Sequence, residues 1–257
     1  MPYISIPWIE DQQPLPRSEL ALANGLVAAG ADLSTSRLLE AYALGLFPWF
    51  NAAEPILWWS PDPRAVLACQ QFKLSKSLAK LCRRIARTEF APDGEFKITT
   101  NCDFLAVIRH CAQLREHQQG TWISRDIIHA YYQLHLQQHA HSIEVWQNQQ
   151  LVGGLYGVQL GRFFFGESMF SLVNNASKVA LYYLTRYLLS SLAIEHIDCQ
   201  QRTPHLTSLG AIEVPRAQFN KWLSQTSTQP LPQPWGQGQL CAQGYCHPVP
   251  YFLRSTP

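Results

Sequence analysis

The sequence is poor in charge and has no long apolar run. Charged residues make up 15% of the 257 residues, against about 25% in an average globular protein. The net charge of +2 excludes a strongly basic protein that coats nucleic acid, although a local basic patch can still bind RNA. No stretch of about 18 consecutive apolar residues is present, so we expect no transmembrane helix and no membrane partner.

Signals of export are also missing. The segment Met1–Asp11 has neither the basic start nor the apolar centre of a signal peptide. The seven cysteines are an odd number and are scattered along a chain that is long enough to fold without disulfides. We therefore expect reduced thiols and a cytoplasmic protein.

Several sequence motifs of cofactor and metal sites are absent. There is no P-loop, no G-x-G-x-x-G and no G-x-S-x-G. His135 and His139 are four residues apart, but Leu136 stands where a metalloprotease needs Glu, which favours a polar helix end. Cys241, Cys246 and His247 lack the second ligand pair of a zinc site. We expect no cofactor and no metal.

Apolar residues are plentiful, at 47%, and predict a sizeable core. Hydrophobic periodicity predicts both helices and strands along the chain. A Pro- and Gln-rich tail from residue 225 is expected to be irregular. The helices are expected at 34–46, 75–87, 103–113, 123–137, 176–192, 205–209 and from 219, and the strands at 65–68, 141–147, 150–159, 162–170 and 194–200.

This order indicates an α+β protein. A three-strand meander, a long helix and a further strand resemble half of an N-acetyltransferase-like (GNAT) domain, with a mixed sheet flanked by helices. The break at Ser60-Pro61-Asp62-Pro63 suggests a boundary. We expect a small N-terminal domain (1–63), a GNAT-like catalytic domain (64–225) and a C-terminal tail (226–257).

The segment that would bind coenzyme A in such a domain lacks the glycine residues that this binding requires. It should follow the meander and open the long helix. The chain has Ser168-Met169-Phe170-Ser171-Leu172-Val173-Asn174-Asn175 there, without glycine. A diphosphate needs close approach of the backbone, which glycine permits. The sequence therefore argues against an acyl-CoA donor.

Six of the 20 basic residues fall within 15 positions and have no acidic residue between them. Their spacing of mostly three or four places them on one face of a helix. A face of one sign repels itself, so a phosphate-binding stripe is favoured over an ordinary solvated face. The residues are Lys73, Lys76, Lys80, Arg83, Arg84 and Arg87.

Three polar residues lie in apolar surroundings. Glu167 follows the run Phe163–Phe165, and a carboxylate there is costly unless it is paired or functional. Asp198 and Gln200 are two apart on an expected strand, so both should face one side, beside the strand that carries Glu167. They form either a polar site between apolar walls or a structural hydrogen-bond network.

Aromatic residues gather near the N-terminus. Trp49, Trp58 and Trp59, with Trp122 and Tyr131 further on, are candidates for stacking on a nucleobase. Core packing is the alternative and is the more common use of tryptophan.

Long ordered strings of the chain resemble the leucyl/phenylalanyl-tRNA–protein transferase family of bacteria. The resemblance runs from about residue 24 to 216. The strings are Gly45–Phe50, Ile56–Arg64, Gly120–Ile123, Ala140–Trp146, Leu151–Gly157, Phe165–Ser171 and Asp198–Gln200.

The resemblance implies an enzyme that moves Leu or Phe from aminoacyl-tRNA to the N-terminal Arg or Lys of a protein, which marks that protein for degradation. It implies a small N-terminal domain, a GNAT-like domain and no coenzyme A. By the same resemblance Trp49, Trp122 and Tyr131 bind the aminoacyl-adenosine, and the basic helix contacts the tRNA backbone. Leu155, Phe164, Leu181 and Ile197 form the pocket for the aminoacyl side chain, and Glu167, Asp198 and Gln200 form the catalytic group.

The donor is an activated ester and the nucleophile is an α-amine. We expect the Gln200 side-chain oxygen to orient the amine, Asp198 to hold Gln200, and Glu167 to position the acceptor or move the proton. The alternatives are an acyl-CoA-dependent acetyltransferase, a non-catalytic tRNA-binding module, and a related tRNA-dependent ligase that acts on peptidoglycan.

Overall fold

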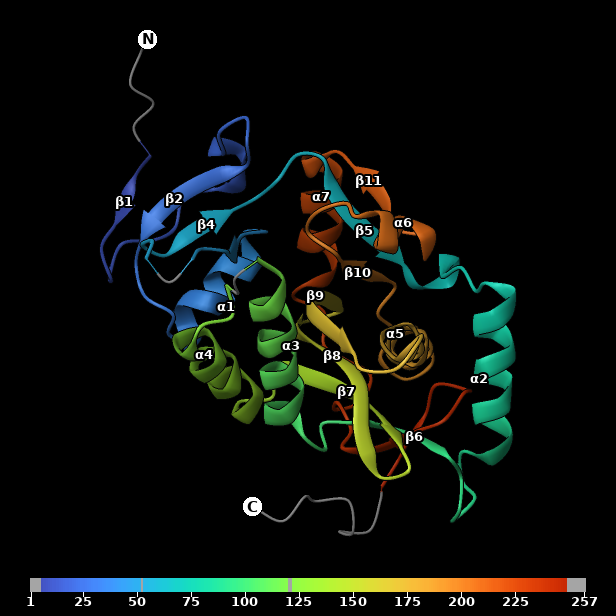
Figure 1. Cartoon of the computed structure of the whole chain (residues 1–257). Coiled ribbons are helices and arrows are strands. Elements are labelled where there is room, and N and C mark those ends of the chain that lie inside the picture. The colour runs from blue at the N-terminus through green and yellow to red at the C-terminus, as the bar shows by residue number, and fades with distance from the viewer. Residues whose placement is uncertain (1–5, 52, 120–121, 249–257) are drawn as a thin grey trace.

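The computed structural model describes residues 6–51, 53–119 and 122–248 (Figure 1). The N-terminal part forms a four-stranded sheet of order β1-β2-β4-β3, in which only β1 and β2 are parallel. One helix, α1, lies next to it. The elements are β1 (Trp8–Ile9), β2 (Leu26–Gly30), α1 (Thr35–Ala43), β3 (Phe47–Pro48) and β4 (Leu57–Trp59).

The rest of the described chain forms a nine-stranded sheet of order β11-β5-β10-β9-β8-β7-β6-β12-β13. Only β9 and β10 pair in parallel, so the sheet is mixed, as expected. The predicted meander is β7 to β9. The strands are β5 (Arg64–Ala68), β6 (Phe96–Thr100), β7 (Ala140–Gln147), β8 (Gln150–Leu160), β9 (Phe163–Ser171), β10 (His196–Asp198), β11 (Ile212–Val214), β12 (Gly238–Leu240) and β13 (Cys246–His247).

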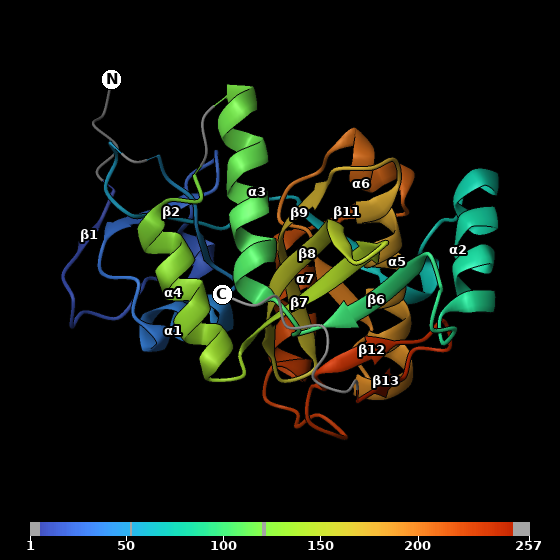
Figure 2. The ribbon, with the colours of Figure 1, turned by 60° about the horizontal axis from the view of Figure 1, so that its bottom comes forward.

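Helices cover both faces of this sheet (Figure 2). Side chains of α1, α3, α4 and α7 share one core with Tyr156, Phe163 and Phe165, whereas α2 and α5 pack with Phe164 in a second core. The α+β class is therefore confirmed. The helices are α2 (Lys76–Thr88), α3 (Phe104–Gln119), α4 (Arg125–Leu136), α5 (Ala176–Tyr187), α6 (Pro204–Ser208) and α7 (Arg216–Thr226).

Most of the expected elements are present, with shifted ends. Ser34 and Ser75 cap α1 and α2, because each hydroxyl accepts a backbone N–H of the first turn. Helix α1 ends at Ala43 rather than at Leu46, since Gly45 takes a left-handed φ of 72°. Helix α5 ends at Tyr187 and continues as a π-helical turn, Leu188–Leu192. Strand β6 was not predicted.

The expectation of an irregular tail is wrong for part of it. Strand β12 adds to the sheet by pairing with β6. The Trp235 ring is buried, stacks on His141 with centroids 4.0 Å apart, and donates from Nε1 to Thr100 Oγ1 at 2.9 Å. This segment is part of the core. Residues 249–257 of the tail lie outside the described residues, as do Gly120 and Thr121 of the family-like strings.

Within the described residues no helix is long and apolar enough to cross a membrane. In the same part of the chain no three His, Cys, Asp or Glu side chains group as a metal site requires.

Substitution of Trp235 tests whether the tail stabilises the fold. We expect Trp235→Ala to lower the free energy of unfolding by about 3–5 kcal/mol, because it removes a buried indole and its hydrogen bond. Trp8→Ala is the matched control. The Trp8 side chain is 60% exposed, so its loss should cost no more than about 0.5 kcal/mol. Urea unfolding measures both, and equal midpoints for the two variants would contradict the prediction.

Candidate active site

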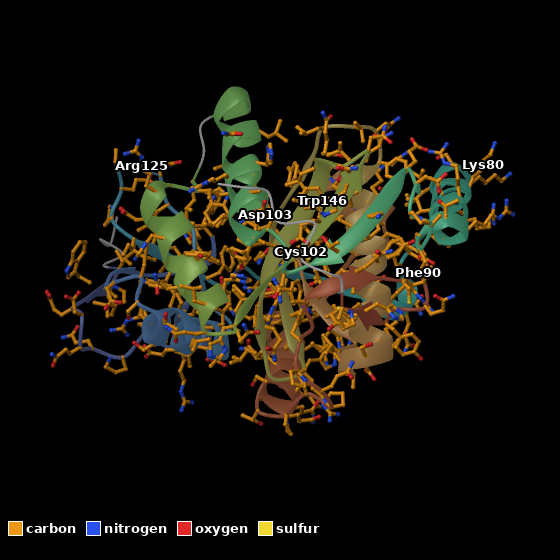
Figure 3. All side chains as sticks on the ribbon, turned by 90° about the horizontal axis from the view of Figure 1, so that it is seen from below. Lys80, Phe90, Cys102, Asp103, Arg125 and Trp146 are labelled. Atoms are coloured by element: carbon orange, nitrogen blue, oxygen red, sulfur yellow. The ribbon has the colours of Figure 1, made fainter. Side chains whose placement is uncertain are left out.

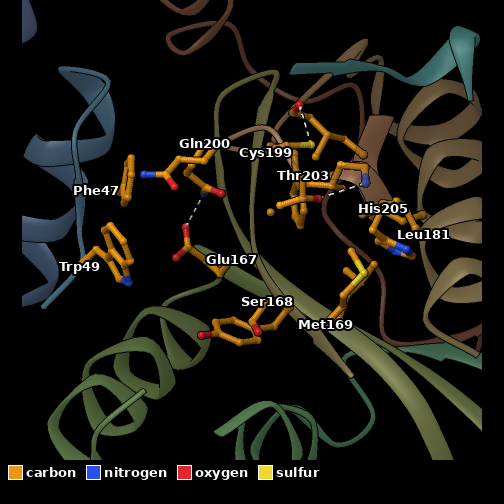
Figure 4. Close-up of a pocket in the computed structure, with 18 of the residues that line it drawn as sticks. Phe47, Trp49, Glu167, Ser168, Met169, Leu181, Cys199, Gln200, Thr203 and His205 are labelled. Atoms are coloured by element: carbon orange, nitrogen blue, oxygen red, sulfur yellow. Dashed lines mark hydrogen bonds between the residues drawn. The ribbon is translucent and has the colours of Figure 1, made fainter. Parts of the chain in front are cut away.

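One pocket of about 290 Å³ lies between the N-terminal part and the large sheet (Figure 4). Its wall on one side comes from β3 and the following residue, and on the other from β9, α5 and α6. Its surface is mainly apolar, with a few polar groups toward the centre. These polar groups include Glu167, Ser168, Gln200 and Gln201.

A β-bulge places Glu167 in this pocket. On β8, Tyr156 pairs with Ser168 and Gly157 pairs with Gly166, so Glu167 is the extra residue of β9. A bulge breaks the alternation of a strand and can redirect one side chain. The Glu167 carboxylate therefore faces the pocket although the Phe residues before it belong to the core.

Two buried tyrosines hold the Glu167 carboxylate from behind. Tyr42 of α1 donates to Oε1 at 2.8 Å, and Tyr131 of α4 donates to Oε2 at 3.0 Å. The two hydroxyls lie 2.6 Å apart. Both carboxylate oxygens are thus fixed by side chains from two helices that pack on the same face of the sheet.

The environment raises the pKa of Glu167 to about 7. Burial is the main cause, because it disfavours the charged carboxylate. The Asp198 charge also raises the pKa, while the tyrosine hydroxyls and the Arg64 charge oppose the rise. A carboxyl group with this pKa can accept and return a proton near neutral pH.

Asp198 lies behind the pocket rather than in its wall. Its carboxylate is fully buried and forms a two-point ion pair with Arg64, with Oδ1 at 2.8 Å from Nε and Oδ2 at 2.7 Å from Nη2. Oδ1 also accepts the backbone N–H of Gln200 at 2.9 Å. The expected contact between Asp198 and Gln200 is present, but it is made to the Gln200 backbone.

Gln200 lies in a turn and not on the strand, so the expectation that it follows strand alternation is wrong. Strand β10 ends at Asp198, and Gln200 takes a left-handed φ of 54°. Its carbonyl oxygen accepts the N–H of Ala65 at 3.1 Å. The turn carries the side chain into the pocket, where Nε2 lies 3.4 Å from Glu167 Oε1. Strained backbone of this kind persists where the surroundings enforce it.

The candidate aromatic residues separate into two groups. Trp49 and Trp122 line the pocket, and Trp49 is 41% exposed. Trp58 is fully buried and donates to the Gly30 carbonyl, so it belongs to the core. Tyr131 is also fully buried and is not among the residues that line the pocket. It contacts Glu167 instead.

All four residues expected in the side-chain pocket are brought together. Leu155, Phe164, Leu181 and Ile197 line one end, with Phe164 and Ile197 paired across the parallel strands β9 and β10. Four further side chains at this end were not predicted, and they come from β9, α5 and α6. They are Met169, Leu184, His205 and Leu206.

None of the six basic residues of the stripe lines this pocket. All six side chains are exposed, and the residues from Lys76 onward lie on α2, whereas Lys73 precedes the helix. Helix α2 forms an outer edge of the molecule (Figure 3), where Lys80 points to solvent. Arg84 lies 3.4 Å from Glu95, and both side chains are largely exposed, so this pair contributes little.

Sequence reasoning missed Tyr42 and Arg64. Arg64 is the first residue of a short apolar strand. A charge buried at such a position requires a partner, so the sequence position could have indicated that Arg64 is paired. Tyr42 resembles any other apolar position of an amphipathic helix, so no signal separated it from the core.

Comparison with known proteins identifies the family. A family model described as leucyl/phenylalanyl-tRNA protein transferase matches residues 66–224, and a model of the N-terminal domain of that family matches residues 31–62. A solved structure described as a conserved protein of unknown function from Bacteroides thetaiotaomicron has a TM-score of only 0.37 at 12% identity, and covers 77% of this chain and 65% of its own.

Two curated relatives are named leucyl/phenylalanyl-tRNA--protein transferase. The relative from Bordetella petrii is 51% identical over 249 residues, which are 96% of this chain and 98% of the relative. The relative from Nitrosospira multiformis is 50% identical over 222 residues, which are 86% and 91% of the two chains. The chain belongs to the leucyl/phenylalanyl-tRNA–protein transferase family.

Proposed function

We propose that this protein transfers Leu or Phe from aminoacyl-tRNA to the N-terminal Arg or Lys of acceptor proteins and so marks them for degradation. One observation carries the proposal. A single pocket joins an aromatic wall, an apolar slot and a carboxyl group whose pKa is about 7. These are the three things that the transfer of an apolar aminoacyl ester requires.

The donor fills the pocket from end to end. The terminal adenosine lies against Trp49 and Trp122, and the aminoacyl side chain enters the slot formed by Leu155, Phe164, Leu181 and Ile197. Stacking on an aromatic ring contributes about 1–3 kcal/mol per base. Charged donor side chains are rejected because burial in an apolar slot leaves them without a partner.

The reaction forms one amide bond and breaks one ester bond. The neutral α-amine of the acceptor attacks the ester carbon, and its usual pKa of about 7.7–8.0 leaves a useful neutral fraction at pH 7. Ionised Glu167 accepts the proton that the amine loses. The same proton then passes to the departing 3′ oxygen of the tRNA, which leaves Glu167 ionised again.

The remaining polar residues orient the reactants. We propose that the Gln200 carboxamide oxygen accepts from the attacking amine, since an amide is a poor base but a good acceptor. Asp198 contributes by fixing the turn that carries Gln200, and Tyr42 and Tyr131 fix Glu167. Orientation supplies most of the rate, because the ester is already activated.

The stripe of six basic side chains on and before α2 is proposed to contact the tRNA backbone away from the 3′ end. Its exposure and single sign support this proposal. We also propose a GNAT-like catalytic domain at 64–225, an N-terminal domain at 1–63, a tail at 226–257 and a cytoplasmic location. The meander, helix α5 and the parallel pair of β9 and β10 support the GNAT-like assignment.

A donor comparison tests the proposed function against acetyl transfer. The protein is mixed with a peptide that begins with Arg and given either Leu-tRNA or acetyl-CoA. We expect a leucyl adduct from Leu-tRNA alone, read by mass spectrometry, because the glycine-free segment at 172–175 offers no close approach to a diphosphate. An acetyl adduct would contradict the proposal, and tRNA binding without any adduct would favour a binding module.

Substitution of Glu167 tests the proton transfer. Glu167→Gln should lower kcat at pH 7 by about 10²–10⁴-fold, because the amide keeps the shape but cannot take a proton. In the wild type the rate should fall below pH 7, where Glu167 becomes protonated. In Glu167→Gln this acid limb of the pH–rate profile should disappear, so that only the titration of the acceptor α-amine shapes the profile.

Glu195→Gln is the matched control, since Glu195 is exposed just before β10 and lines no part of this pocket. It should keep both kcat and the wild-type pH profile. A Glu167→Gln variant with the wild-type profile would show that another group carries the proton.

A further inference from the structure

The Arg64 guanidinium is fully buried behind the pocket, where it contacts Phe47 of one wall and Asp198 behind the other. Its Nε and Nη2 bind the Asp198 carboxylate, and Nη1 donates to the Gly45 carbonyl at 3.1 Å. The guanidinium also lies between the rings of Phe47 and Phe219, at 4.9 and 4.5 Å from their centroids. It lines no part of the pocket itself.

Each of these contacts fixes one element of the site. Phe47 and the following Pro48 and Trp49 form the aromatic wall, and Gly45 starts that segment. Gly45 has a φ of 72°, and a Cβ there would lie 3.0 Å from the Phe219 ring, so no larger residue fits without strain. On the opposite side, Asp198 accepts the N–H of Gln200 and so fixes the turn.

We infer that Arg64 is a positioning residue for the transfer reaction, which sets the place of the aromatic wall and of the Gln200 turn and balances the charge behind Glu167. The inference rests on the proposed function and extends it to a residue that touches neither donor nor acceptor. Arg64 does this from one side chain because the guanidinium has five donors in a fixed plane.

The charge balance follows from the groups that face Glu167. These are Tyr42 from α1, Tyr131 from α4, Gln200 from the turn, Asp198 from β10 and Arg64 from β5. Only Asp198 and Arg64 carry opposite full charges, and they act on the Glu167 pKa in opposite directions. Removal of Arg64 alone leaves the Asp198 charge unopposed, so anionic Glu167 becomes less stable and its pKa rises.

Four variants separate positioning from charge. Arg64→Gln should move the acid limb of the rate profile to higher pH by about one unit, which is a tenfold loss on that limb. Asp198→Asn should move the limb to lower pH. The double variant should return it toward the wild-type position, since both charges are gone. Arg64→Lys keeps the charge but loses the planar fork, so kcat should fall while the limb stays in place.

Arg202→Gln is the matched control. Arg202 pairs with Glu213 at 3.1 Å on the surface, and its side chain is 60% exposed, so its loss should leave the limb unmoved. Circular dichroism and thermal unfolding report whether each variant folds. If Arg64→Gln fails to fold, Asp198→Asn and the double variant still give different predictions, a limb at lower pH and a limb near the wild-type position.

An infrared titration of the Glu167 carboxyl tests this inference independently of the proposed function, because the measurement requires no aminoacyl transfer. The wild type minus Glu167→Gln difference spectrum isolates that carboxyl. Its midpoint should rise in Arg64→Gln and fall in Asp198→Asn, even if no aminoacyl adduct is ever formed. Midpoints and acid limbs that stay at the wild-type pH in both single variants would overturn the inference.

Discussion

The pocket depends on one buried ion pair, between Arg64 and Asp198. The two residues are 134 positions apart in sequence, and neither side chain is accessible to water. Burial of two charges is costly, and the pair is favourable only because both partners are further satisfied by hydrogen bonds. Those bonds run to the Gly45 carbonyl, two residues before the aromatic wall, and from the N–H of Gln200 in the opposite wall. The two side chains whose burial is costly, Arg64 and Asp198, are therefore the same ones that fix the geometry of the pocket.

The second constraint is the placement of a carboxylate among aromatic rings. The bulge at Glu167 takes it out of the strand pattern, and two tyrosine hydroxyls prevent its carboxylate from being left without partners. Burial raises its pKa while these hydroxyls limit the rise. The balance leaves the pKa of Glu167 at about 7, so that its carboxyl group can both accept and release a proton near neutral pH. A fully solvated glutamate would remain ionised and would return the proton poorly.

Much of this arrangement follows from the sequence. The sequence predicted the meander and two helices that begin at Ser34 and Ser75, the residues that cap α1 and α2 in the structure. The four slot residues were expected only from resemblance to a family, whereas Glu167, Asp198 and Gln200 were first indicated by their polar character in apolar surroundings. Local patterns were too weak for β12, which has only three residues, follows a Pro-rich segment and is held by long-range pairing with β6.

What local patterns cannot supply is contact over long range. Tyr42 contacts a residue 125 positions away, and nothing in its own helix marks it. Tyr131 likewise donates to Glu167, 36 positions away, and its own helix does not indicate that contact. The turn at Gln200 has a left-handed backbone that strand periodicity does not foresee, because Asp198 and Ala65 impose it.

The central claim is that one pocket holds the aminoacyl-adenosine between the tryptophan wall and the apolar slot. Calorimetric titration with a stable 3′-amide analogue of phenylalanyl-adenosine tests it most directly, in the wild type, Trp49→Ala and Leu181→Ala. We expect one saturable site whose affinity is lower in both variants, by about 1–3 kcal/mol where stacking is lost. Equal affinity in all three proteins would contradict it.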